Sequence, residues 1–270
     1  MNLDEAVHRL RATATDDTIP FHYFVEAADR VIAEVQFASA DMSAGAELFR
    51  ARVNQPGQRF AHRQEIAYIT NPAHIRHYGR VNLPGCAMFY CSTDFMTAFM
   101  ETVDSTLRAA ANVDGTVTIG TWRVEVSIPR VAVAFDSDEL TRVLAGSDTV
   151  GDVIRDVLKR GGRVFTDDAQ RAMRLLNTLF RARVTNSAEY RASCAIFEAL
   201  ARKTRVDGIS YPSVMSEALG MNTALRPDVV DQHLKLIDVC MVDFRKRSRE
   251  VELRVKESSY FGSDGRFEFR

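Results

Sequence analysis

The spacing of apolar residues changes along the chain, and this change constrains the fold more than any other feature. Residues 21–35 repeat apolar side chains at intervals of three and four, the pattern of an amphipathic helix. Residues 117–128 instead alternate apolar and mostly polar side chains, the period of a strand. Helical spacing returns between residues 139 and 205, and strand-like runs follow at 208–211, 236–242 and 251–255. These alternating blocks predict a mixed α+β fold.

The same patterns predict how the chain is divided. Two N-terminal helices, broken near Thr18-Ile19-Pro20, form an extension over residues 1–45. Residues 46–270 form the main domain, with a helical insert at about 139–205. Within it we expect one slip of the strand period near Trp122. Further strands are predicted at 47–53, 66–69 and 131–135.

Composition excludes several classes of protein. The chain has 270 residues, 46% of them hydrophobic, and a formal charge of −1 with scattered basic residues, so we expect no nucleic-acid partner. It has no run of eighteen uncharged apolar residues and no secretion signal, so we expect no membrane partner. The four cysteines form no CxxC pair, which favours a reducing, cytoplasmic compartment.

Residues 79–101 contain the strongest candidates for binding and catalytic residues. A polar turn with Pro84 and Gly85 leads into a short apolar run, and a helix follows with Asp94 or Thr93 as its N-cap. This loop, strand and helix would bring Arg80, Tyr90 and Glu101 near one another. A guanidinium, an aromatic ring and a carboxylate together suit a phosphate-bearing nucleotide.

Three other patterns are weaker candidates for a functional site. His74 and His77 lack an intervening Glu or a third ligand, so we predict a loop pair and no metal site. The run Gly161-Gly162-Arg163 is too short for a dinucleotide or phosphate loop. The charged residues 245–250 are predicted to form a solvated hairpin turn.

Several short motifs, taken in order, resemble the RES domain family, which is named for its Arg, Glu and Ser. They run from about residue 47 to about residue 242. The matching segments are Leu48-Phe49-Arg50-Ala51, Gly79-Arg80-Val81-Asn82, Phe89-Tyr90, Thr97-Ala98-Phe99-Met100-Glu101, Gly208-Ile209-Ser210-Tyr211-Pro212-Ser213 and Gly220-Met221-Asn222-Thr223-Ala224-Leu225. Each motif alone is weak, and the ordered set gives the resemblance its specificity.

The resemblance implies an ADP-ribosyltransferase-like β-sheet core and an activity on NAD, commonly its breakdown by toxins of bacterial toxin–antitoxin pairs. NAD would then be the substrate, no prosthetic group would be needed, and an antitoxin protein would be a partner. Two departures stand out. Val81 occupies a position where the family usually has an aromatic residue, and the chain is longer than compact family members at both the N-terminal helices and the insert.

Glu101 is the expected catalytic carboxylate. Cleavage of the nicotinamide–ribose bond passes through a transition state resembling an oxocarbenium ion, and a nearby carboxylate stabilises its positive charge. The alternative is a glutamate that simply faces solvent on a helix.

Arg80 and Arg50 are the candidates for binding the pyrophosphate, because a planar guanidinium holds phosphate oxygens in a two-pronged way. Arg80 is preferred, since Arg52 lies two residues from Arg50 on the same face of the predicted strand and competes with it. Asn82 is expected to orient Arg80 or a phosphate, or else only to end the turn before Pro84.

Tyr90 would stack on nicotinamide or cap the ribose site, although a strand tyrosine packed in the core is the simpler alternative. Ser213 would hydrogen-bond the ribose or the nicotinamide amide, in a turn that Pro212 stiffens. No His-Asp motif lies nearby in sequence, so we do not interpret Ser213 as a nucleophile.

Two classes of function follow. The first is an NAD-consuming enzyme that hydrolyses or phosphorolyses the nicotinamide–ribose bond, with ADP-ribosyl transfer to a macromolecule as its close relative. The second is a catalytically inactive NAD- or ADP-ribose-binding interaction protein. The sequence leaves open whether water, phosphate or a macromolecule accepts the ADP-ribose group. It also leaves the oligomeric state open, and a homodimer is compatible with it.

Overall fold

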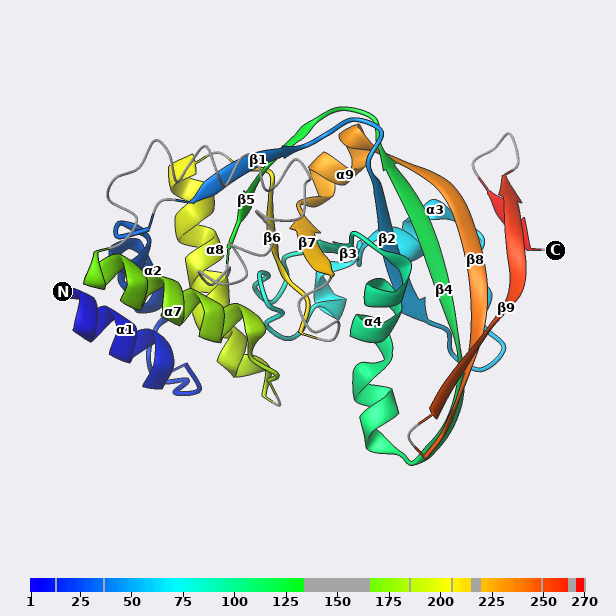
Figure 1. Ribbon diagram of the computed structural model, residues 1–270, viewed down its shortest axis with the longest axis horizontal. Helices are drawn as coiled ribbons and strands as arrows, with labels where there is room; N and C mark the ends of the chain where they lie inside the picture. Colours follow the sequence, from blue (N-terminus) through cyan, green and yellow to red (C-terminus); the bar gives the residue numbers. More distant parts are fainter. Residues whose placement is uncertain are drawn as a thin grey trace. The chain divides into compact units, whose positions relative to one another are not determined.

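The computed structural model describes residues 1–12, 14–35, 37–133, 166–184, 186–204, 206–214, 220–248, 250–261 and 266–269. These residues contain seven α-helices and ten β-strands, so the fold is α+β as predicted (Figure 1). The chain divides into two compact units, each built from several segments. Unit 1 contains residues 1–41, 71–88 and 129–212, and unit 2 contains residues 42–70, 89–128 and 213–270.

Unit 1 is mainly helical. Its elements are α1 (Leu3–Ala12), α2 (Phe21–Ile32), α7 (Asp167–Arg181) and α8 (Arg191–Thr204), with short 3-10 turns at Pro72–His74 and Ser187–Tyr190 and three strands, β1 (Ala38–Met42), β5 (Ile128–Ala132) and β6 (Gly208–Pro212). β5 and β6 run parallel. Helix α2 packs on α8, and it buries the apolar face that the sequence predicted, including Phe24, Ala28 and Val31.

A buried arginine ties the N-terminal helices to α8. Arg191 is 4% exposed and donates hydrogen bonds to the carbonyl oxygens of Ala14, Asp16 and Ile19, in the turn that joins α1 to α2. Its guanidinium also lies 4.5 Å from the centre of the Phe24 ring. Because one guanidinium satisfies three backbone acceptors, the connection between α1 and α2 is held against α8.

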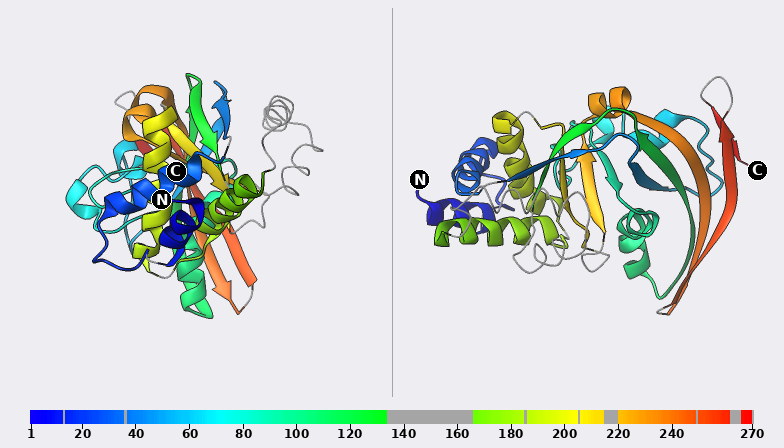
Figure 2. Two further views of the ribbon diagram at one scale, coloured as in Figure 1. Left: turned by 90° about the vertical axis from the view of Figure 1, so that its left-hand side faces the viewer. Right: turned by 45° about the horizontal axis from the view of Figure 1, so that its top comes forward.

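Unit 2 contains an antiparallel sheet with strand order β7-β3-β2-β4-β8-β9-β10. The strands are β2 (Glu47–Val53), β3 (Phe89–Ser92), β4 (Asn112–Val124), β7 (Met221–Leu225), β8 (Leu234–Arg247), β9 (Glu250–Phe261) and β10 (Phe267–Phe269), and the helices are α3 (Arg63–Ala67), α4 (Phe95–Ala109) and α9 (Pro227–His233). Figure 2 shows the long strands β4, β8 and β9 curving around α4.

Each face of this sheet has its own hydrophobic core. Leu48, Phe89 and Trp122 belong to the core that includes residues of α3 and α9. Ala51, Phe99 and Phe244 belong to the core under α4. Leu48 and Ala51 are three positions apart on β2 and face opposite sides, as the two-residue period of a strand requires. α4 therefore packs on one face of the sheet, and α3 and α9 contribute to the core on the other face.

Most of the predicted elements are confirmed. β2 has the predicted bounds, α4 starts after Asp94 as predicted, and the register of β4 against β8 shifts between Thr121 and Trp122. The hairpin predicted at 245–250 joins β8 to β9, with Arg247 opposite Glu250. The strand predicted at 131–135 begins earlier, as β5 at Ile128–Ala132.

The strand predicted at 66–69 is wrong, because Ile66 and Ala67 end helix α3. The carboxylate of Glu65 accepts hydrogen bonds from the backbone N–H groups of Ala61 and His62, which caps the helix start. Residues 134–165, including the first part of the predicted insert and Gly161-Gly162-Arg163, lie outside the described residues. α7 and α8 form the described part of the insert, in the same unit as α1 and α2. The domain boundary at residue 45 stays a prediction.

Candidate active site

The carboxylate of Glu101 lies at the centre of a compact hydrogen-bond network in unit 2. Its Oε1 accepts from the Ser213 hydroxyl at 2.6 Å, from the Asn222 side-chain amide at 2.8 Å and from the Val214 backbone N–H at 3.2 Å. Within the described part of the chain, no donor contacts the other oxygen, Oε2. Three donors on one oxygen fix the orientation of the carboxylate.

Helix α4 presents Glu101 because it is fixed at both ends. Asp94 caps the first turn by accepting a hydrogen bond from Thr97 N–H at 2.8 Å. At the other end, the Lys246 ammonium on β8 donates to the carbonyl oxygens of Leu107 and Ala110, the latter at 2.9 Å. A cation at the helix C-terminus satisfies carbonyl groups that have no partner within the helix and interacts favourably with the helix dipole.

The partners of Glu101 come from the segment around β7. Ser213 is 2% exposed, and its N–H donates to Gly220 O at 2.8 Å, which closes the connection into β7. Asn222 is directly opposite Ser92 of β3, and the Ser92 hydroxyl donates to Asn222 Oδ1 at 2.7 Å. Because its oxygen is occupied by Ser92, Asn222 turns its NH₂ group towards Glu101.

Tyr90 lies on the same sheet face as this network. It is two residues from Ser92 on β3, so both side chains point to the side opposite the buried Phe89 and Cys91. Tyr90 is half-buried, whereas a tyrosine packed in the core, the alternative interpretation of this residue, would be fully buried. An aromatic ring at this place flanks the carboxylate network without belonging to the hydrophobic core.

Arg50 lies on the other face of the sheet but reaches the same strand. Its guanidinium donates to Tyr90 O at 2.6 Å and to Ile66 O at 3.1 Å, and it lies over the Phe89 ring. β2 and β3 share a single aligned pair, Phe49 with Ser92, so Arg50 bridges the point where the two strands separate. Burial, together with the neighbouring charge of Arg52, lowers the pKa of Arg50 to about 10.

Arg52 has different surroundings. It donates to Glu65 O at 2.6 Å and lies over Phe60, away from β3. Burial also lowers its pKa, and Glu65 acts in the opposite direction. Of the two arginines that the sequence could not separate, Arg50 is the one that contacts the strand carrying Tyr90.

Arg80 and Asn82 belong to unit 1, where both take part in local structure. The Arg80 guanidinium donates to Leu179 O at 3.2 Å and to Ala182 O at 3.0 Å, at the C-terminal end of α7. It also lies between the rings of Tyr190 and Tyr211. These contacts hold the end of α7 in the way that a C-terminal cation does.

Asn82 ends the turn before Pro84. Its other predicted role, orienting Arg80 or a phosphate, stays a prediction. Its backbone oxygen accepts from Gly79 N–H at 3.0 Å, and its side chain donates to Leu83 O at 3.1 Å. The buried Cys194 thiol of α8 lies 3.0 Å from Gly79 O and 3.2 Å from Asn82 O, which anchors the same turn. Burial raises the pKa of Cys194 far above its usual range, so the thiol stays protonated and can donate.

The structure therefore brings Glu101 and Ser213 into contact, with Tyr90 on the same face and Arg50 behind it. Sequence reasoning missed two members of this network, Asn222 and Ser92. Asn222 lies in a segment that resembled the family, which was the available signal, whereas Ser92 carries none. Among the described residues, no group of three His, Cys, Asp or Glu side chains could hold a metal ion. No described helix is long and apolar enough to span a membrane.

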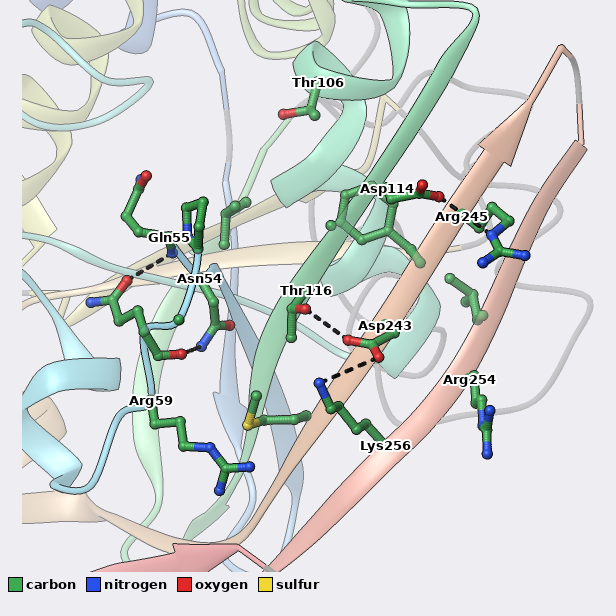
Figure 3. Close-up of a pocket in the computed structure, with 18 of the residues that line it drawn as sticks. Asn54, Gln55, Arg59, Thr106, Asp114, Thr116, Asp243, Arg245, Arg254 and Lys256 are labelled. Carbon is green, nitrogen blue, oxygen red and sulfur yellow. Dashed lines mark hydrogen bonds and ion pairs between the residues drawn. The ribbon is translucent and has the colours of Figure 1, made fainter.

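Unit 2 also contains an open cavity of about 840 Å³, lined by the loop at 54–59 and by parts of β4, β8 and β9 (Figure 3). Four of its charged side chains form ion pairs within the lining, Lys256 with Asp243 at 3.7 Å and Arg245 with Asp114 at 3.4 Å. Neither Glu101 nor its hydrogen-bond partners line this cavity. The cavity is therefore separate from the carboxylate network.

The comparison with family models agrees with the sequence motifs. The model of the RES domain matches residues 47–243, from the first residue of β2 into β8. The chain belongs to the RES domain family. The RES span contains Glu101, Ser213 and Asn222, and β9 and β10 lie beyond its end. No curated protein matches the sequence.

Proposed function

We propose that this RES domain protein consumes NAD by cleaving the nicotinamide–ribose bond through hydrolysis or phosphorolysis. Family membership supports NAD as the substrate class, and the network around Glu101 supports the chemistry. A carboxylate whose Oε1 is held by three donors keeps its orientation, so Oε2 can face the developing positive charge of the ribose. The observation that carries the proposal is this fixed Glu101 carboxylate.

The remaining predicted residues have matching roles. Tyr90 stacks on nicotinamide or caps the ribose, on the sheet face that it shares with Asn222. Arg50 and Arg80 are the proposed pyrophosphate ligands. Among the described residues Arg50 has no carboxylate partner, and because it lies on the sheet face opposite Glu101, it would bind phosphate at the point where β2 and β3 separate. The proposed biological role is a growth-arresting toxin that a partner antitoxin inhibits.

The proposal is tested by measuring nicotinamide release from NAD by chromatography, with and without phosphate. Glu101→Gln keeps the shape of the side chain and removes its charge, so turnover should fall by about a hundredfold to a thousandfold. Asp104→Asn is the matched control, because Asp104 is another carboxylate of α4 and pairs with Arg108. Wild-type turnover in the Glu101→Gln variant would refute the assigned role.

The product distinguishes the acceptors. Free ADP-ribose would indicate water, and a phosphorylated sugar formed only with phosphate would indicate phosphorolysis. Label transferred from NAD to proteins of a lysate would indicate ADP-ribosyl transfer. Binding of NAD by calorimetry without release of nicotinamide or transfer of label would favour the catalytically inactive binding protein instead.

A further inference from the structure

The edge of the sheet in unit 2 has an open stretch on β9. β8 pairs with one side of this strand, from Arg247 opposite Glu250 to Cys240 opposite Ser258. On the other side, β10 pairs only with residues 259–261. No other described strand pairs with β9, so residues 250–258 present a row of backbone groups at a free edge.

Side chains along this edge are exposed on both faces. Val255 is 59% exposed and Val251 is 37% exposed, and both lie on the face where Leu253 packs against the α4 core. Glu252 and Arg254 lie on the opposite face and line the cavity of Figure 3. In the described part of the chain, neither Glu252 nor Arg254 forms an ion pair. Within the chain, Glu252 lies opposite Arg245 of β8 and Arg254 lies opposite Asp243, and the outer edge of β9 leaves the two valines exposed to another strand.

The sequence of the edge is complementary to itself. When Glu250-Val251-Glu252-Leu253-Arg254-Val255-Lys256 is laid antiparallel against an identical copy, with Leu253 opposite Leu253, every charge meets its opposite. Glu252 then faces Arg254, and Glu250 faces Lys256. The two exposed valines face each other, so the same register also buries the apolar side chains.

Other registers lose this match. In an edge strand, every second residue directs both its N–H and its C=O away from the sheet. Two such strands can pair only when these outward-directed residues lie opposite each other, so the two-fold axis must pass through a residue and not between two residues. A centre at residue 252 would put Glu252 against Glu252, and a centre at residue 254 would put Arg254 against Arg254. Like charges directly opposite are destabilising. The charges therefore select the register centred on Leu253.

We propose that β9 pairs antiparallel with β9 of a second copy of this chain, around a two-fold axis at Leu253. A β-bulge against β8 falls at Lys256, where Met241 pairs with Glu257 and Val242 with Val255. Lys256 and its partner Glu250 therefore lie at the bulge, and the regular part of the new ladder is residues 251–255 of each copy. This strand lies outside the RES span at 47–243, so the dimer interface belongs to this chain's own C-terminal hairpin.

Charge exchange tests the register. Sedimentation of the full chain should show a monomer–dimer equilibrium, and Glu252→Arg should weaken it by about tenfold, because two symmetry-related pairs become repulsive. Arg254→Glu should weaken it similarly, and the double variant Glu252→Arg/Arg254→Glu should restore wild-type dimerisation. Both side chains are exposed but lie opposite Arg245 and Asp243 of β8, so circular dichroism is recorded for each variant to show that it is folded at the temperature of sedimentation. A wild type that stays monomeric, or a double variant as weak as the single ones, would refute the proposed pairing.

Cross-linking tests the centre of the pair independently. In a background where the exposed Cys86 is replaced by serine, Leu253→Cys should be joined to its symmetry mate by a short bismaleimide. Val251→Cys is the control, because Val251 faces Val255 of the other copy and its own mate lies about 13 Å away along the strand. Equal cross-linking of both variants, or cross-linking of Val251→Cys alone, would contradict the register.

Discussion

At the scale of residues, the site depends on how one oxygen of Glu101 is held. The three donors to Oε1 come from a serine hydroxyl, an asparagine amide and a backbone N–H, so two of them can be removed by substitution. The hydroxyl of Ser213 makes the shortest of the three hydrogen bonds, at 2.6 Å. It also belongs to a buried residue, so no solvent molecule readily replaces it.

Ser213→Ala should therefore lower turnover while leaving the protein folded. Glu101 would keep two donors but lose the bond that best defines its direction, and we expect kcat to fall by about tenfold to a hundredfold. Nicotinamide release at saturating NAD measures this effect. Ser193→Ala on α8 is the control, since that hydroxyl donates only to the Tyr190 carbonyl. An unchanged kcat would mean that Ser213 does not orient the carboxylate.

Arg50→Lys should weaken NAD binding more than it changes the chemical step. Arg50 keeps its proton at neutral pH, because its lowered pKa of about 10 is still far above 7. A lysine keeps this charge but lacks the planar guanidinium that bridges Ile66 O and Tyr90 O, so KM should rise by about tenfold with a smaller change in kcat. Arg52→Lys serves as the matched control. A larger KM effect at Arg52 would exchange the roles of the two arginines.

At the scale of elements, the sequence predicted the strands and helices whose apolar pattern is regular. α2, α4 and β2 were predictable because each buries one stripe or face, and the Asp94 cap marks the start of α4. The segment at 66–69 was mistaken for a strand, because a five-residue helix is too short to show a period and depends on the Glu65 cap. β7 was missed as a strand for a similar reason, since pairing with β3 defines it.

The same limit applies to the site. Glu101 and Ser213 were identified from motifs, but their contact depends on the ladder between β3 and β7, which no local pattern contains. Arg80 is preferred over Arg50 for phosphate in the sequence because Arg52 competes with Arg50, and this role stays a prediction. Its hydrogen bonds to the end of α7 could not be predicted, since α7 lies about a hundred residues away along the chain.

The pairing of β4 with β8 depends on a glycine. Gly115 lies directly opposite Phe244, and a Cβ atom at residue 115 would lie 2.4 Å from that ring. Gly115→Ala should therefore lower the free energy of unfolding by about 1–3 kcal/mol, measured by denaturant titration. In a Phe244→Leu background the same substitution should cost less. Equal costs in both backgrounds would show that the ring is not the obstacle.

At the scale of the whole molecule, α1 and α2 complete the helical core of unit 1. The buried face of α2 covers α8, and Arg191 of α8 binds the turn between α1 and α2. The RES span begins only at residue 47, so this covering is formed by residues outside the family match. The helices are thus expected to be needed for folding, although they precede the RES span.

A chain that starts at Ala38 should consequently lose stability. Removing α1 and α2 uncovers the side of α8 that packs on α2, and leaves Arg191 without its three backbone acceptors. We expect a thermal transition by circular dichroism that is lower and less cooperative than in the full chain. A chain lacking only Met1 is the control, because Asn2 caps the start of α1. An unchanged transition would show that the two helices are an independent appendage.

The hydrogen bonds from Ser92 through Asn222 to Glu101 have a direction. The serine donates to the amide oxygen, and the amide NH₂ donates to the carboxylate. An amide group holds its protons too tightly to pass one along, so this chain transmits orientation but conducts no proton. Asn222 therefore does not relay protons to Glu101. A proton that reaches or leaves Glu101 is transferred through the Ser213 hydroxyl or at Oε2, where the substrate is expected to bind.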